Sequence, residues 1–216
     1  STLPNFYLNS INGYHAAKLG RYNDVMEFYI NKTQMNSLDM LNTKYIIYND
    51  ENKKNVYVND DIPGSAWFVN ENINVANDND EILSLDSLNF KNISVSQVFE
   101  SKKYKNTDYR VDLIEKKSNY LKYEVESDDF GLIIFSEIYY PHGWNSYVNG
   151  KKVSHFRFNY ILRGLEVPSG KYYIEFKFEP EVVELSSKIS LFSSISFILI
   201  FIIGLLVKRK EWKEKF

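Results

Sequence analysis

The chain has 216 residues, of which 25% are charged, with a formal net charge of −2 and no cysteine. The lack of cysteine excludes disulfides, a thiolate nucleophile and cysteine metal ligands. Residues 1–207 carry 21 basic and 26 acidic side chains, and so acidic a body argues against a nucleic-acid partner.

Residues 1–105 predict a small mixed α/β region that begins with helical turns. Apolar residues recur at helical spacing within residues 10–30, from about Tyr14 onward, and this periodicity predicts a short amphipathic helix. Residues 33–42 offer a second helical turn, with Ser37 as its expected N-cap. The side chains expected on the apolar face of the first helix are Ala16, Leu19, Val25, Met26 and Tyr29.

Short strands and one further helix complete this region. The segments KYIIYND and VYVND have the composition of two strands joined by a polar turn. A third short strand is expected from Ala66 to Val69, after a turn at Pro63 and Gly64. The segment NDNDEILSLDSL predicts a helix capped by an Asn or Asp between 77 and 80. Its core-facing residues are expected to be Ile82, Leu83, Leu85 and Leu88.

Residues 106–180 change to the period of two that is typical of β-strands. Asn149 and Gly150 suit the tight type I′ turn of a hairpin in WNSYVNGKKVSHF. The strand NYILRGLEV is expected to pair with KYYIEFKFEP across the turn 168–170. The inward face of the second of these strands is expected to hold Tyr172, Ile174, Phe176 and Phe178. Six strands joined by short turns predict an antiparallel β-sandwich, jelly-roll or immunoglobulin-like, in a chain that is α+β but mainly β.

The segment from Ser190 to Val207, SLFSSISFILIFIIGLLV, has no charged residue and no proline. Extended back to Leu185, the helix 185–207 is long enough to cross a hydrocarbon core of about 30 Å. Residues 208–216 follow with five basic and two acidic side chains, which predicts a cytoplasmic tail and an extracytoplasmic body. The alternative is a buried helix of a soluble protein.

The β region contains a dense group of polar and aromatic residues that could contact a carbohydrate. Aromatic rings cover the apolar side of a pyranose, and carboxylate, amide or guanidinium groups bind its hydroxyls. The candidate residues are Glu137, Tyr139, Tyr140, His142, Trp144, Asn159 and Arg163. The structural alternative is that Trp144 and the tyrosines close the edge of the sandwich, with Arg163 paired to Glu137.

A second candidate is a small anion or lipid-phosphate site formed by His15, Lys18 and Arg21, which the alternative treats as a solvated helix face. A pair of catalytic carboxylates, Glu137 with Glu166 or Asp129, is conceivable, but nothing in the sequence singles these acids out. The three histidines lie far apart and have no metal-binding spacing, so neither a metal nor a cofactor is expected.

Two long stretches resemble one family. INGYHAAKLGRYNDVMEFYI, followed by MLNTKYII and GSAWFV, resembles the start of the C-terminal extracytoplasmic region of YfhO-type bacterial membrane proteins. GLIIFSEIYYPHGWNSYVNGKKV and the residues up to KYYIEFKFEP resemble the segment before the last transmembrane helix of these proteins. The chain departs from the family's usual YYPGW by an inserted residue, His142.

The resemblance implies a polytopic glycosyltransferase of the GT-C type, which transfers sugars from a polyprenyl-phosphate carrier to cell-envelope polymers or lipids. The family's catalytic acid is expected upstream, so no catalytic residue is assigned here. The chain is then expected to be the C-terminal accessory domain of a larger protein in the bacterial cytoplasmic membrane. Its expected partners are the bilayer, the rest of that protein, and a glycan or lipid-linked sugar. The alternatives are a non-catalytic carbohydrate-binding module and a purely structural domain.

Overall fold

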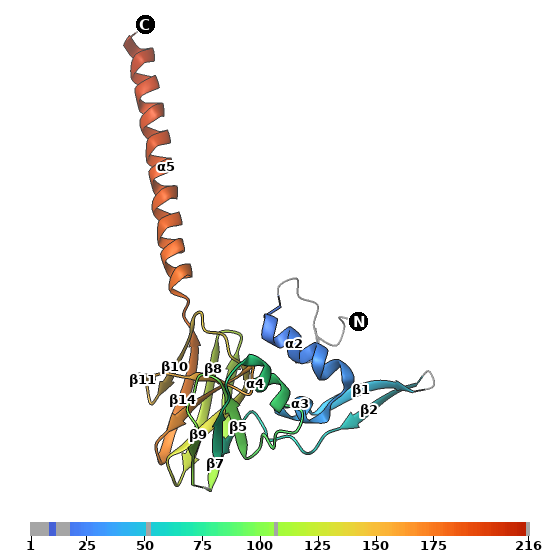
Figure 1. The fold of residues 1–216 in the computed structure, drawn as a ribbon. Helices are drawn as coiled ribbons and strands as arrows, with labels where there is room; N and C mark the ends of the chain where they lie inside the picture. Colours follow the sequence, from blue (N-terminus) through green and yellow to red (C-terminus); the bar gives the residue numbers. More distant parts are fainter. Residues whose placement is uncertain (1–8, 12–17, 51–52, 106–107, 215–216) are drawn as a thin grey trace.

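The computed structural model describes residues 9–11, 18–50, 53–105 and 108–214. Two antiparallel sheets form the body, and a layer of short helices and strands covers the outer face of the smaller sheet (Figure 1). A long C-terminal helix projects from one end of the body. The chain is therefore mainly β, as predicted.

The larger sheet has five strands, which come from the second half of the chain. In spatial order they are β11 (Lys151–Val153), β10 (Trp144–Val148), β14 (Gly170–Phe178), β8 (Tyr120–Ser127) and β7 (Tyr109–Lys117). The hairpin between β10 and β11 turns at Asn149 and Gly150, whose φ angles are 47° and 78°. This positive-φ pair confirms the predicted type I′ turn.

The smaller sheet has four strands, in the order β12 (Phe156–Phe158), β13 (Leu162–Val167), β9 (Gly131–Ile138) and β3 (Ala66–Val69). Its edge strand β3 comes from the first 105 residues, so the predicted α/β region and the β region share one sheet. Adjacent residues of β3 point to opposite faces, because strand side chains alternate. Phe68 joins the core between the two sheets, whereas Trp67 joins the core under the third layer.

The core between the sheets shows the predicted period of two. Leu121, Tyr123 and Val125 of β8 are buried there, as are Tyr172, Ile174 and Phe176 of β14. The expected fourth inward residue of β14, Phe178, is 37% exposed, because it lies at the end of the strand next to the C-terminal helix.

The third layer holds short helices and a small mixed sheet. Its elements are α2 (Gly20–Phe28), η1 (Ile30–Lys32), α3 (Met35–Met40), α4 (Asp78–Ser84), β4 (Glu71–Asn74), β5 (Ile93–Ser96) and β6 (Lys102–Lys103). Val25, Met26 and Tyr29 face the core as predicted, and Asn77 caps α4 by accepting a hydrogen bond from the Asp80 amide. Residues 12–17, including the predicted Ala16, lie outside the described residues.

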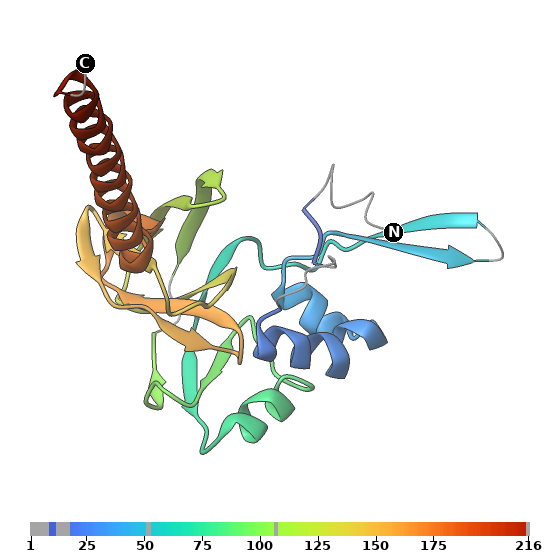
Figure 2. The same cartoon turned by 90° about the horizontal axis from the view of Figure 1, so that it is seen from above.

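The strands β1 (Tyr45–Asp50) and β2 (Lys53–Val58) form the predicted hairpin, which extends away from the body (Figure 2). Most of its apolar side chains are exposed, on both faces. Those that are at least 46% exposed are Tyr45, Ile47, Tyr48, Val56, Tyr57 and Val58.

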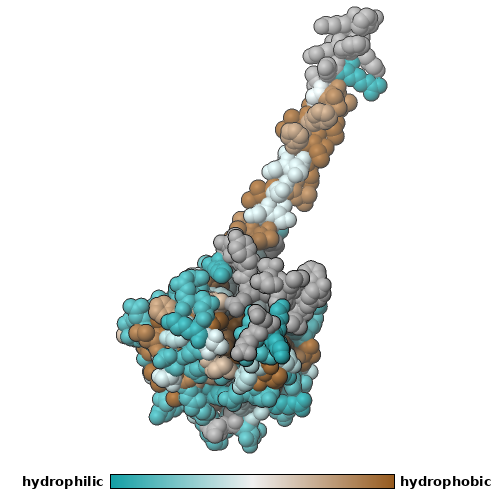
Figure 3. All heavy atoms as spheres, turned by 90° about the vertical axis from the view of Figure 1, so that its right-hand side faces the viewer, coloured by the Kyte–Doolittle hydropathy of each residue, from teal (hydrophilic) through white to brown (hydrophobic). Residues whose placement is uncertain are grey.

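Helix α5 (Glu181–Glu214) contains the predicted apolar segment. It is the one helix among the described residues that is long and apolar enough to cross a membrane, over Leu185–Leu206. None of that window is buried, and Figure 3 shows its hydrophobic side chains standing clear of a largely hydrophilic body. An unburied apolar helix of this length does not fit the alternative of a buried helix in a soluble protein.

Three local predictions are wrong. Strands β13 and β14 do not pair: residues 168–169 carry the chain from the smaller sheet to the larger one. Ser37 lies inside α3 rather than at its N-cap, which is Gln34, and its hydroxyl donates to the Gln34 side chain. Leu83 is 62% exposed, because α4 is a single short helix whose core-facing side is set by Ile82.

Candidate functional site

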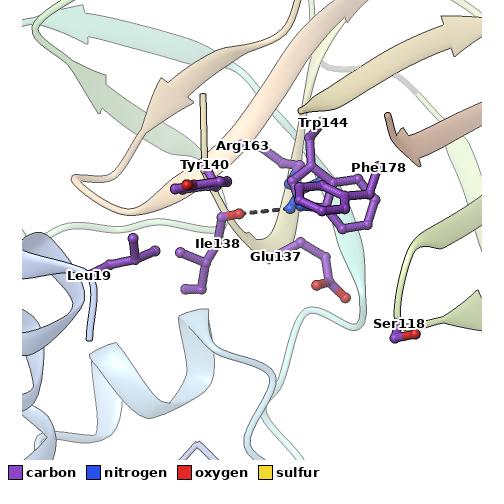
Figure 4. A pocket seen from close by; sticks show the side chains of 8 residues that line it. All are labelled: Leu19, Ser118, Glu137, Ile138, Tyr140, Trp144, Arg163 and Phe178. Carbon is purple, nitrogen blue, oxygen red and sulfur yellow. Dashed lines mark hydrogen bonds between the residues drawn. The ribbon is translucent and has the colours of Figure 1, made fainter. Parts of the chain in front are cut away.

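A hollow of about 360 Å³ opens at the end of the sandwich from which α5 leaves (Figure 4). Strands β9, β10, β13 and β14 reach it, together with the turn between β7 and β8 and the residue before α2. Its lining residues are Leu19, Ser118, Glu137, Ile138, Tyr140, Trp144, Arg163 and Phe178. Four of the seven predicted carbohydrate-site residues are therefore brought together: Glu137, Tyr140, Trp144 and Arg163.

Strand alternation explains why polar side chains gather here. Arg163 has the same parity on β13 as Leu165 and Val167, which are buried between the sheets. On β9, Glu137 likewise follows the inward residues Ile133 and Phe135. The inter-sheet core thus ends in a guanidinium and a carboxylate instead of further aliphatic side chains.

Arg163 is the most deeply buried charged residue of the hollow, with 3% of its surface exposed. Its guanidinium carbon lies 4.6 Å from the centre of the Trp144 ring and 5.0 Å from that of Phe176. Its Nη2 donates to the Ile138 carbonyl over 2.7 Å, whereas Nε and Nη1 find no acceptor within the described chain. Burial lowers the pKa of Arg163, an effect that the charge of Glu137 opposes.

Glu137 pairs with Lys116 of β7, whose Nζ lies 2.8 Å from its carboxylate. The pairing of Glu137 with Arg163 in the structural alternative is therefore not the ion pair that forms. Because the Glu137 side chain is 21% exposed, its carboxylate can still be reached from solvent. The hollow thus combines a carboxylate paired with Lys116 and a buried guanidinium with two unpaired nitrogens, Nε and Nη1.

Further polar groups lie behind Arg163. The His155 ring stands edge-on to Phe176, and its Nδ1 is 3.0 Å from the Ser146 hydroxyl. Burial, with the nearby charge of Arg163, lowers the pKa of His155 to about 4. His155 Nε2 and the Tyr123 hydroxyl are also buried without a hydrogen-bond partner in the part of the chain that is described.

An ionic network holds α2, and with it Leu19, against the body. Arg21 donates to Asp78 over 2.5 Å and lies over the Tyr160 ring. Glu81 of α4 is fully buried and accepts from the Tyr160 amide and from Arg157. Burial raises the pKa of Glu81, although Arg157 works against that shift. The network joins α2 and α4 to the turn after β12.

The other predicted carbohydrate residues do not line the hollow. Tyr139 packs against the His155 ring, and His142 is exposed beside Tyr140. Asn159 is fully buried in the turn between β12 and β13, where its side-chain oxygen Oδ1 accepts a hydrogen bond from the Val95 amide. Four lining residues were not predicted as site residues: Leu19, Ser118, Ile138 and Phe178. Leu19, expected on the apolar face of the first helix, is 41% exposed and borders the hollow instead, and Phe178 was expected on the inward face of β14.

The predicted anion site is described only in part. His15 lies outside the described residues, Lys18 is exposed, and Arg21 faces the carboxylates of Asp78 and Glu81. Of the possible carboxylate pairs, Glu166 accepts from Lys102 and Tyr104 in the third layer, whereas Glu137 contacts the larger sheet. Glu137 and Glu166 thus lie on opposite faces of the smaller sheet.

The comparison with protein families decides the class of the chain. The family described as bacterial membrane protein YfhO matches residues 69–190. The chain belongs to the YfhO family. No curated protein and no solved structure matches it.

The YfhO match runs from the last residue of β3 into α5. It therefore includes every lining residue of the hollow except Leu19. The hollow presents two partly exposed aromatic rings and one accessible carboxylate, with a buried guanidinium beneath the Trp144 ring. That combination suits a polyhydroxylated or an anionic group beside the candidate membrane span.

Proposed function

We propose that this chain is the C-terminal accessory region of a polytopic, glycosyltransferase-like membrane protein that acts on cell-envelope glycans with a polyprenyl-phosphate sugar donor. In this proposal the body lies outside the cytoplasmic membrane and the basic tail 208–216 lies inside, as the positive-inside rule favours. The YfhO family membership supports the class of protein. The observation that carries the proposed role is the hollow at the foot of α5, which would contact the sugar of a lipid-linked substrate.

The chemistry of the hollow matches a sugar in three respects. Trp144 and Tyr140 are partly exposed and offer ring faces to the apolar side of a pyranose. The Glu137 carboxylate can accept from a hydroxyl, and the Arg163 guanidinium beneath Trp144 could donate to one once that ring moves aside. No catalytic step is assigned to these residues, so the region would position or admit a substrate.

The test replaces Trp144 by Ala in the full-length protein and measures glycosylation of envelope polymers at matched protein levels. Loss of a stacking ring is expected to lower transfer on the order of tenfold, and Trp144→Phe should restore most of it. Tyr173→Ala is the matched control, because Tyr173 is exposed on β14, five residues before the hollow residue Phe178. Unchanged glycosylation in Trp144→Ala, at normal protein levels, would rule out the sugar contact.

One observation favours the purely structural alternative. The Trp144 ring packs 5.4 Å from that of Phe178 and covers the Arg163 guanidinium, so it also closes the end of the sandwich. In that case Trp144→Ala would lower stability, by up to about 3 kcal/mol, and glycosylation would fall only in proportion to the folded protein. Thermal unfolding of the purified variant separates the two roles.

As a non-catalytic binding module, the chain would instead bind envelope glycans directly, with an affinity that Trp144→Ala weakens.

A further inference from the structure

The unpaired donors of Arg163 carry an inference that goes beyond the sugar contact. We infer that the hollow at the foot of α5 is a binding site for a phosphate group at the membrane surface, held by the Arg163 guanidinium. Either a lipid headgroup or a soluble phosphate could supply this group.

Arg163 is buried with part of its guanidinium unpaired. A buried guanidinium is costly unless its N–H groups meet acceptors, and two of them, Nε and Nη1, meet none among the described residues. Nε and Nη1 lie on different edges of the guanidinium, and each can donate one charge-assisted hydrogen bond to a phosphate oxygen. The charges at the hollow also favour an anion, because Lys116 already pairs with Glu137. Arg163 thus leaves a net positive site.

The hollow lies close to the start of the candidate membrane span. Phe178 lines the hollow, and the Glu179 amide donates to the Gly143 carbonyl just before α5 starts at Glu181. At about 1.5 Å per residue, only about 6 Å of helix separate Glu181 from Leu185, where the candidate span begins. The headgroup layer is roughly 5–8 Å thick on each side of the hydrocarbon core. With Leu185–Leu206 spanning that core, the hollow would lie at the level of lipid phosphates.

The Trp144 ring covers the Arg163 guanidinium. The Trp144 ring lies 4.6 Å from the Arg163 guanidinium carbon and is itself partly exposed. Nε and Nη1 are buried in this conformation, and displacement of the ring toward the bilayer would open a path to them from the hollow. Tryptophan is favoured at the membrane interface, so the displaced ring has a suitable environment. Phosphate binding should therefore change Trp144 fluorescence as well as stability.

The experiment uses the whole chain in polyoxyethylene detergent micelles, which contain neither sugar nor phosphate. Inorganic phosphate, at about ten times its Kd, is expected to raise the unfolding midpoint by on the order of 3–6 °C over chloride of equal ionic strength. Arg163→Met should abolish the shift, whereas Lys171→Gln, a charge loss at the far end of β14, should keep it. No shift in the wild type, or an equal shift in Arg163→Met, overturns the inference.

Glu137→Gln separates this inference from the proposed sugar contact, and it also decides the matter if Arg163→Met does not fold. Removing a carboxylate beside the site should tighten phosphate binding severalfold, because like charges repel. The same change replaces a charged acceptor of sugar hydroxyls with a weaker neutral amide and should weaken glycan binding. Phosphate binding that is unchanged or weaker in Glu137→Gln contradicts the inference, and glycan binding that does not weaken counts against the sugar contact alone.

A lipid arm distinguishes the two sources of phosphate. Phosphatidylglycerol added to the micelles should raise the midpoint more than uncharged diacylglycerol does, and free phosphate should compete with it. That result assigns the site to headgroups. A shift with free phosphate and none with phosphatidylglycerol assigns it to a soluble phosphate, and the absence of both rejects the site.

Discussion

At the scale of single residues, the alternation of side chains along a strand brings Arg163 and Glu137 to the hollow, because both point between the two sheets. Arg163 and Glu137 occupy positions on β13 and β9 that apolar residues hold elsewhere in these strands. On the other face of β13, Gly164 has no room for a side chain. A Cβ on Gly164 would lie 2.8 Å from the Ile133 carbonyl oxygen and 2.8 Å from a Phe158 ring carbon. The backbone contact cannot relax by a rotamer change.

We therefore expect Gly164→Ala to destabilise the chain by about 1–3 kcal/mol through overpacking. Gly20→Ala is the matched control, because nothing lies within 4 Å of its Cβ position at the start of α2. That variant should stay within about 0.5 kcal/mol of the wild type. Chemical unfolding of both variants measures the difference, and equal stabilities would show that β13 can shift to admit the methyl group.

His155 makes a second residue-scale prediction, for acid stability. Its folded pKa of about 4 lies below the usual 6.5, so between these values the unfolded chain binds more protons than the folded one. Its contribution to stability is complete above pH 6.5 and is lost as the pH falls toward 4, on the order of 3 kcal/mol. His155→Gln should flatten the pH dependence of the unfolding midpoint in this window. The same acid loss in the variant would contradict the assignment.

Four of the lining residues were predicted from residue type, because a Trp, a Tyr, an Arg and a Glu seldom occur so close together in a sequence. Asn159 and Tyr139 belong to the same group in sequence but turn elsewhere. Asn159 adopts a positive φ of 48° in a turn, a conformation that Asn tolerates, but the predicted strand NYILRGLEV began at this residue. Leu19 reaches the hollow only because distant ion pairs place α2, and no local pattern encodes that contact.

At the scale of elements, periodicity predicted most strands but not all of their partners. The strand pattern in NYILRGLEV and KYYIEFKFEP is correct, yet a tight turn at 168–169 led to the wrong pairing. The turn instead crosses between sheets, and only the long-range pairing of β13 with β9 and of β14 with β8 shows this. Short-range signals describe hairpins well and crossovers poorly.

The β1–β2 hairpin is expected to be the least stable element of the body. It pairs with no other strand among the described residues and exposes apolar side chains on both faces. Its backbone amides should therefore exchange with deuterium about a thousandfold or more faster than those of β9, which is central and buried. Hydrogen exchange with mass spectrometry can compare the two segments. Equal protection would mean that the hairpin opens only with the whole body.

At the scale of the whole molecule, the body and α5 are joined but independent. Both hydrophobic cores consist of residues before α5, and none of the Leu185–Leu206 window is buried. We expect a chain truncated after Pro180 to stay soluble without detergent. Its unfolding midpoint should lie within about 2 °C of that of the whole chain. Aggregation or unfolding of the truncated chain would show that the helix supports the body.

Strand β3 contributes to both hydrophobic cores, and this affects the order in which the chain can fold during synthesis. Trp67 and Phe68 serve different cores, and the partner strand β9 is synthesised only after β4 to β8. On the ribosome, β3 therefore waits as an unpaired apolar segment while much of the body emerges. Strand β14, which lies between β8 and β10, is the last to appear and precedes α5 directly. The larger sheet can therefore be completed only when β14, its last strand in the chain, has been made.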